Sequence, residues 1–242
     1  MSTSSGTRGP YAKTAAKRAA IARAAYEVVR EVGHEQLTTA AVAERADMSE
    51  RTMLYHFPTR DHLLVAALEH FDTVVMGAEL FTELLEGSDA RKALLLASPP
   101  PTAAESEQVI TELVNTSISD KARLRLYCYL AGQAQVPGSA AHEHFVRHYE
   151  EAITGFTLLM QSFQNTGQAR TDRSPQTLAR RFLAAWDGLQ QQWVVTEDFD
   201  LGAEILEAFN DAVGRDLLRT RAAVRAVLED IAPTTPSAQK TQ

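Results

Sequence analysis

Apolar residues along this chain recur at steps of three and four positions, which is the period of an amphipathic helix. The first such segment runs from about Thr14 to Val32, and Gly33 is expected to end it in the left-handed conformation. Its apolar stripe consists of Ile21, Ala24, Ala25, Val28 and Val32. No segment shows the sustained period-two alternation of a half-buried strand. The pattern therefore predicts an all-α fold.

Capping residues and helix breakers divide the rest of the chain into further helices. A second helix is expected after Thr38 or Thr39, a third after the cap Ser49, and a fourth after Thr59 that continues to about Val75. The prolines at 99–101 interrupt the helical pattern. Later caps are expected at Thr102, Ser119, Ser139 and Ser174, and Gly167 is expected to close the helix that begins near Ser139. Residues 201–231 are expected to form one helix or two, and residues 232–242 a disordered tail.

The segment from Glu50 to Phe57 is a short helix with two different sides. Its apolar side holds Met53, Leu54 and Phe57, and its polar side holds Arg51, Thr52 and Tyr55, with His56 at the margin. A helix this short is stable only when its neighbours hold it. A helix-turn-helix meets this condition, because its second helix packs on the first and enters the major groove of DNA with the other side free. A helical corner that packs and does nothing else is the alternative.

Charge is distributed unevenly along the chain. The net charge is −7, yet residues 1–23 carry five cations and no acid. A basic N-terminal arm on an acidic body suggests local contact with a polyanion, although a solvated tail has the same composition. The single cysteine, Cys128, cannot form an internal disulfide, and neither a signal peptide nor a membrane-spanning run is recognisable. These features predict a cytoplasmic protein with no membrane partner.

The run LTTAAVAERADMSERTMLYHFPTRDHLL, residues 37–64, resembles the DNA-binding domain of the TetR (tetracycline-repressor) family of bacterial transcriptional regulators. The residues that match in order and spacing are Val42, Ala43, Ala46, Ser49, Thr52, Tyr55, His56, Phe57 and Arg60, and upstream Ile21, Ala24, Ala25 and Gly33. The resemblance implies a basic arm at 1–13, a helix-turn-helix DNA-binding domain at 14–58, and a helical bundle at 59–231 that binds a ligand and dimerises. Asp47 replaces the usual turn glycine and Leu54 replaces an aromatic residue, so the pattern of base contacts is expected to differ.

The resemblance and the helical geometry together suggest roles for the polar residues of the head. Lys13, Lys17 and Arg18 are expected to hold the DNA backbone or an adjacent minor groove. The expected phosphate contacts are Thr38, Thr39, Thr52, Tyr55, His56, Thr59 and Arg60. Arg51 is the candidate for a base edge, because bidentate contact between arginine and guanine is the commonest specific contact. Tyr55 could also pack on a thymine methyl, and Glu50 could accept from cytosine or favour the helix N-terminus.

The C-terminal part is expected to bind a small-molecule effector and a second copy of the chain. The candidate ligand-binding residues are Tyr127, Tyr129, Phe156, Met160, Phe163, Trp186, Gln190 and Trp193, although plain core packing is the commoner role of such residues. The candidate dimer interface consists of Phe182, Ala185, Leu189, Ile205, Leu206, Phe209 and Val213. A homodimer would read a pseudo-palindromic operator and, as a repressor, be released by its effector. No cofactor is expected.

Other functions remain open from the sequence. A regulator of this type could activate transcription or act without a ligand. His144 and His148 lie four residues apart on a helix and could bind a metal ion, although the order of the zinc-protease motif is absent. Cys128 could be a catalytic thiol, but its apolar helix favours a buried position, and no phosphate-binding or hydrolase motif is present. We therefore do not expect an enzyme.

Overall fold

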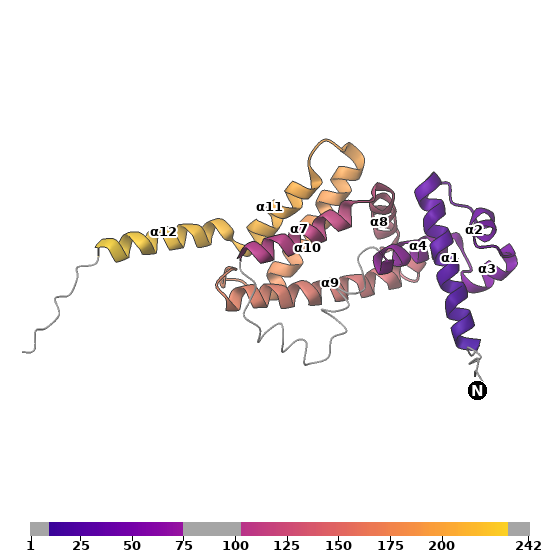
Figure 1. Ribbon diagram of the computed structural model, residues 1–242, viewed down its shortest axis with the longest axis horizontal. Coiled ribbons are helices and arrows are strands. Elements are labelled where there is room, and N and C mark those ends of the chain that lie inside the picture. Colours follow the sequence, from indigo (N-terminus) through magenta and orange to yellow (C-terminus); the bar gives the residue numbers. More distant parts are fainter. Residues whose placement is uncertain (1–9, 75–102, 232–242) are drawn as a thin grey trace, which may run out of the picture.

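The computed structural model describes residues 10–74 and 103–231, and within these ranges all regular structure is helical. The all-α prediction is therefore confirmed. The helices are α1 (Pro10–Val32), α2 (Thr39–Arg45), α3 (Glu50–His56), α4 (Arg60–Val74), α7 (Ala103–Ile118), α8 (Lys121–Gln133), α9 (Ala140–Asn165), α10 (Pro175–Thr196), α11 (Leu201–Val213) and α12 (Arg215–Ile231). Figure 1 shows α1, α2 and α3 as a head at one end of the molecule and α12 extending from the other end.

The head and the neighbouring part of the body share one hydrophobic core. Apolar side chains of α1 pack against α4, and Val42, Ala43 and Met53 from α2 and α3 complete the head. The same cluster continues into α8 and α9 through Tyr127, Leu130 and Phe145. Burial of this continuous apolar surface fixes α4 between the head and the body.

A second core fills the body between α7, α9, α10 and α11. Phe182 from α10 lies at its centre, with ring centroids 5.1 Å from Phe156 and 5.3 Å from Phe209 in edge-to-face arrangements. Such aromatic pairs stabilise a core beyond the area that they bury. The two cores together give the molecule a long shape with the head at one end (Figure 1).

Most of the predicted helix ends are confirmed. The side chains of Thr38, Ser49, Thr59, Ser139 and Ser174 accept from backbone N–H groups at the starts of α2, α3, α4, α9 and α10. Gly33 and Gly167 follow α1 and α9 with positive φ angles of 85° and 73°. One expectation changes, because Asp120 rather than Ser119 caps α8. Of the two alternatives for residues 201–231, the structure has two helices, divided at Gly214 with φ 71°. The predictions for Val75, the prolines at 99–101, Thr102 and the tail lie outside the described residues.

The dimer prediction is wrong for four side chains. Phe182, Ile205, Phe209 and Val213 are at most 2 % exposed within a single chain, because α10 and α11 use them to close the second core. A side chain buried in this way has no surface left for a partner. Ala185, Leu189 and Leu206 keep part of their surface exposed. None of the described helices is long and apolar enough to cross a membrane.

Candidate nucleic-acid interface

Helix α3 is short because strong signals define both of its ends. The Ser49 hydroxyl accepts from the Thr52 backbone N–H at 3.2 Å, and the Phe57 N–H donates to the Met53 carbonyl at 2.9 Å before Pro58 ends the helix. Met53 is fully buried and Phe57 is 5 % exposed, whereas Tyr55 is 84 % exposed. Arg51 is exposed as well. One side of α3 is therefore anchored in the core and the other side faces outward.

The turn between α2 and α3 fixes the angle at which α3 leaves the head. Asp47 adopts the left-handed conformation with φ 51°, in the position where a glycine would be unstrained. The Met48 N–H donates to the Ala43 carbonyl at 3.1 Å and closes this turn. Across it, the Thr39 hydroxyl donates to the Glu50 carboxylate. Glu50 thus holds α3 to α2. Its negative charge also stabilises α3, because it lies at the positive N-terminal end of the helix dipole.

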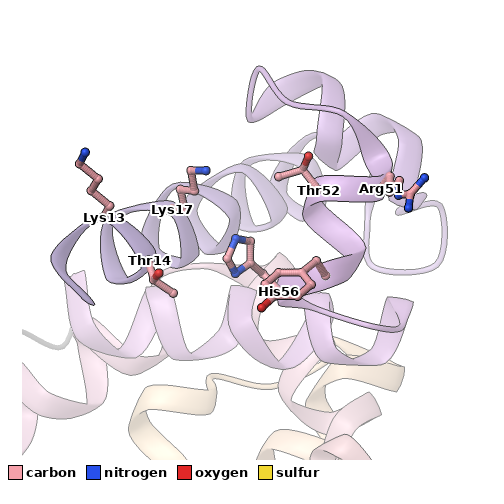
Figure 2. Close-up of a pocket in the computed structure, with 7 residues that line it drawn as sticks. Lys13, Thr14, Lys17, Arg51, Thr52 and His56 are labelled. Atoms are coloured by element: carbon pink, nitrogen blue, oxygen red, sulfur yellow. The ribbon is translucent and has the colours of Figure 1, made fainter. Parts of the chain in front are cut away.

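A concave site of about 440 Å³ opens between α1 and α3, as Figure 2 shows. Lys13 and Lys17 extend from α1 on one side, Thr52 and Arg51 project from α3 on the other, and the His56 ring lies between them. The full lining consists of Lys13, Thr14, Lys17, Arg51, Thr52, Tyr55 and His56. These described lining residues include three cations and no acid, so the site attracts anions.

Six predicted DNA-contacting residues therefore meet in one place, and a seventh lining residue was not predicted. Thr14 follows Lys13 on the same exposed turn of α1, and its small polar side chain gave no signal of its own in the sequence. The three-residue step from Thr14 to Lys17 could have identified it, because residues three apart lie on the same face of a helix.

Arg18 and Arg60 lie elsewhere and make contacts within the protein. The Arg18 guanidinium donates to the His56 carbonyl at 2.8 Å and lies 4.3 Å above the Phe57 ring, so it caps the C-terminal end of α3. The Arg60 guanidinium donates to the carbonyls of Leu37, at 3.0 Å, and of His34 and Glu35. These bonds join α4 to the α1–α2 loop. They use guanidinium N–H groups of Arg60, which was expected to contact phosphate.

Thr38 and Thr59 act first as helix caps. The Thr38 hydroxyl accepts from the Ala41 N–H at 3.1 Å, and the Thr59 hydroxyl accepts from the His62 N–H at 3.4 Å. Both residues are exposed. The N-termini of α2 and α4 therefore remain available to a phosphate group that approaches the head.

The predicted ligand-binding residues are divided between the two cores. Tyr127 and Tyr129 belong to the first core, and Phe156, Met160, Phe163 and Trp186 belong to the second. The Trp193 indole N–H donates to the Phe199 carbonyl at 3.0 Å, so it helps to close the α10–α11 connection. Gln190 is only 3 % exposed, and its Oε1 atom has no hydrogen-bond partner. The contacts of the apolar candidates are those of ordinary core residues.

The two residue types considered for metal binding and catalysis have structural partners. His144 Nδ1 lies 3.3 Å from Glu69 Oε1, and His148 Nε2 lies 3.1 Å from the Tyr127 hydroxyl. Among the residues that the structure describes, no group of three or more His, Cys, Asp or Glu side chains could hold a metal ion. Burial raises the pKa of the Cys128 thiol to about 11, which opposes formation of a nucleophilic thiolate.

Comparisons with known proteins agree with this geometry. Residues 21–67 match the family model of bacterial regulatory proteins of the tetR family. No curated protein sequence matches the chain. A solved structure of a TetR-family transcriptional regulator from Rhodococcus sp., described as putative, is similar over 82 % of this chain and 99 % of its own, with 21 % identity and a TM-score of 0.59.

Two further solved structures share the fold. Thermus thermophilus FadR, a TetR-family transcriptional repressor in complex with lauroyl-CoA, is 18 % identical over 93 % of this chain and 100 % of its own, with a TM-score of 0.54. SmeT, the repressor of the Stenotrophomonas maltophilia multidrug efflux pump SmeDEF, is 20 % identical over 84 % of this chain and 91 % of its own, with a TM-score of 0.56. At these identities the similarity shows the fold, while the match over α1–α4 identifies the head. Residues 21–67 therefore match the DNA-binding head of the tetR family, and the chain shares the all-α fold of solved TetR-family regulators.

Proposed function

We propose that this protein is a ligand-responsive repressor that binds a pseudo-palindromic operator as a homodimer and is released by a small-molecule effector. The observation that carries the proposal is the two-sided α3 helix. Its buried side fixes it to α2, and its outward side, with Arg51 and Tyr55, lies beside Lys13 and Lys17 of α1. This arrangement leaves a rigid helix free to enter a major groove while lysines reach the flanking backbone.

Each residue of the site receives a role that follows from its chemistry. Lys13 and Lys17 contact phosphates, where their charge gives affinity that falls with salt. Arg51 reads a guanine, because among the described residues no carboxylate pairs with its guanidinium. Tyr55 packs on a thymine methyl or binds a phosphate through its hydroxyl. Glu50 serves as an anchor through Thr39 rather than as a base contact.

A dimer is needed because one α3 helix reads only half of a pseudo-palindromic operator. The outer side of α10 supports this part of the proposal. Along it, Ala184 is exposed, Ala185 and Leu189 are partly exposed, and a Cβ added at Gly188 would meet no atom within 4 Å. Val195 continues this row and is 82 % exposed. Small side chains on an exposed helix face allow the same face of a second copy to approach closely.

Release by an effector requires that the body move the head. Polar contacts with Asp120 and with α8 are among those that join them. The Tyr26 hydroxyl of α1 donates to Asp120 at 3.0 Å, Arg30 of α1 lies 3.3 Å from the same carboxylate, and Asp72 of α4 accepts from Arg123 of α8 at 3.0 Å. Since Asp120 also caps α8, a shift of α8 pulls on α1. Effector and operator must then weaken each other's binding by the same factor.

The repressor role and the small-molecule effector gain support from relatives of the same fold. FadR is a repressor that was solved with lauroyl-CoA, and SmeT represses a multidrug efflux pump. Two proteins with such different regulatory tasks use the same head and bundle. We therefore propose repression and ligand control for this chain.

Selection of bound fragments from random duplex DNA tests the DNA-binding part. We expect an enriched sequence with two inverted half-sites, and a reporter placed behind it should be repressed when the protein is expressed. Enrichment of no sequence, or of a single half-site bound by a monomer, would contradict the proposal. A reporter that is activated would retain DNA binding but overturn the repressor assignment.

Sedimentation tests the dimer with a matched pair of variants. Ala184→Arg places a charge on the outer side of α10 and should produce a monomer that binds the full operator weakly. Thr154→Arg adds the same side chain at an exposed position of α9 and should sediment as the wild type does. A wild-type protein that is monomeric at micromolar concentration, or an Ala184→Arg dimer, would rule out this interface.

A further inference from the structure

Among the described residues, Asp187 is a largely buried carboxylate of the body that has no cation as a partner. The two oxygens of Asp187 on α10 accept from the Tyr127 hydroxyl of α8 at 3.0 Å and from the Tyr149 hydroxyl of α9 at 2.9 Å. Burial raises the pKa of this carboxyl group, because removal from water disfavours its charged form. A carboxylate that is largely removed from water and held only by neutral donors carries a free-energy cost that a cation would lower.

The cations of the neighbouring helices are engaged by other acids. On α8, Lys121 and Arg125 lie 2.9 and 2.7 Å from Glu197, and Arg123 lies 3.0 Å from Asp72. Arg147 of α9 lies 3.3 Å from Glu69. Within residues 10–74 and 103–231, no ion pair includes Asp187. The counter-charge of Asp187 therefore does not come from these four side chains.

An unpaired acceptor lies one helical turn away. Gln190 follows Asp187 by three residues on α10, so both side chains leave the same side of the helix. Gln190 is 3 % exposed, and its Oε1 atom lacks a donor. An unsatisfied buried acceptor is costly and calls for an N–H or O–H group from outside the chain. Two acceptors at this place, one of them charged, favour a ligand that donates.

Further aromatic rings pack against the two tyrosines that donate to the carboxylate. The Phe145 ring lies 5.1 Å from Tyr127, 5.7 Å from His148 and 5.9 Å from Tyr149, measured between centroids. Aromatic faces attract ammonium groups and also bury an apolar body. His148, Tyr149 and Asp187 are each partly exposed, so a ligand can reach this aromatic–carboxylate cluster from solvent.

We propose that the effector is an organic cation, a protonated amine on an apolar body, which binds the Asp187 carboxylate among Tyr127, Phe145 and Tyr149 and donates an N–H group to Gln190. The inference rests on the proposed ligand-controlled function and names the ligand class. Binding there joins α8, α9 and α10 through one charge. The Arg123–Asp72 ion pair then passes any displacement of α8 to α4 and the head.

Three probes with one carbon skeleton test the ligand class: 4-phenylbutylammonium, 4-phenylbutanol and 4-phenylbutanoate, which carry charges of about +1, 0 and −1 at pH 7. Titration calorimetry, with the fluorescence of neighbouring Trp186 as a second signal, measures their affinities. We expect the amine to bind at least about ten-fold more tightly than the alcohol, equivalent to about 1.4 kcal/mol, and the carboxylate to bind most weakly. Equal binding of amine and alcohol would overturn the proposal.

Variants assign the preference to the cluster. Asp187→Asn keeps the shape and removes the charge, so the preference for the amine should fall about ten-fold while alcohol binding stays unchanged. Glu151→Gln removes the same charge from an exposed position of α9 and serves as the control. If Asp187→Asn loses its helical circular dichroism, Gln190→Leu provides the second test. Gln190→Leu should bind the primary amine several-fold more weakly than the wild type and bind the N-trimethylated amine, which has no N–H group, with unchanged affinity. If the ratio of the two affinities is the same as in the wild type, the proposal is contradicted.

Operator binding separates this inference from the function beneath it. Saturating 4-phenylbutylammonium should weaken operator binding by the wild type and leave Asp187→Asn on its operator. If the amine leaves operator affinity of the wild type unchanged, the proposed ligand class is wrong, but the proposed DNA-binding function is not affected. If the protein selects no operator from random DNA, the proposed function itself is wrong, whether or not the amine binds.

Discussion

Two substitutions on opposite sides of α3 should have opposite effects, because the core holds one side and DNA contacts the other. Met53→Ala empties a fully buried position. Truncation of a buried methionine costs about 2–5 kcal/mol, and for a chain of this length that lowers the Tm by roughly 4–20 °C. Arg51 is exposed, so Arg51→Ala should change the free energy of unfolding by less than about 0.5 kcal/mol.

Operator affinity should fall more in Arg51→Ala than in Met53→Ala, which is the reverse of their effects on stability. Loss of a bidentate contact with guanine costs about 1–3 kcal/mol at each half-site, which is roughly 5- to 150-fold. Both half-sites lose it in a homodimer, so the two factors multiply. Below its lowered Tm, folded Met53→Ala should bind the operator far better than Arg51→Ala does.

Thermal melts followed by circular dichroism and fluorescence anisotropy at fixed salt measure the two quantities. Lys17→Ala is the control for charge: it should weaken binding to all sequences alike and reduce the slope of log affinity against log salt by about 1 at each half-site, or about 2 for the dimer. An Arg51→Ala protein that binds its operator normally, or that melts as early as Met53→Ala, would refute the two-sided interpretation of α3.

Three other predictions concern how the head and body are held. Arg60→Met removes the bonds to the Leu37, His34 and Glu35 carbonyls and should destabilise the protein by about 1–3 kcal/mol in urea melts; unchanged stability would show that these bonds contribute nothing. Asp47→Ala should be about 1 kcal/mol less stable than Asp47→Gly, since φ is 51° there, and the reverse order would contradict that backbone geometry. Burial lowers the pKa of His148 from 6.5 to about 4. The unfolded chain therefore binds more protons between these pH values, and stability should fall by up to ~3 kcal/mol as the pH drops from 6.5 to 4. His148→Asn should flatten this slope, whereas a slope equal to that of the wild type would exclude His148 as its source.

Sequence periodicity and capping chemistry determined the helices and the two sides of α3. These are local properties: a serine caps the residues that follow it, and a three- to four-residue step places side chains on one face. The Ser49 cap, the buried Met53 and the exposed Arg51 and Tyr55 all follow from residues within one or two helical turns. For the same reason the left-handed Gly33 could be predicted, and so could the polar side on which the candidate DNA contacts gather.

Only the tertiary structure decided which partners those faces meet. Arg18 caps α3 through His56, 38 residues away, and Asp187 meets Tyr127 across a separation of 60 residues. An amphipathic pattern states that a side is buried but not whether its own chain or a second copy buries it, which is why Phe182 and Ile205 were assigned to a dimer and lie in the monomer core instead. Long-range packing selects one neighbour among many of equal hydrophobicity, and that selection depends on shape and chain path, which no local pattern contains.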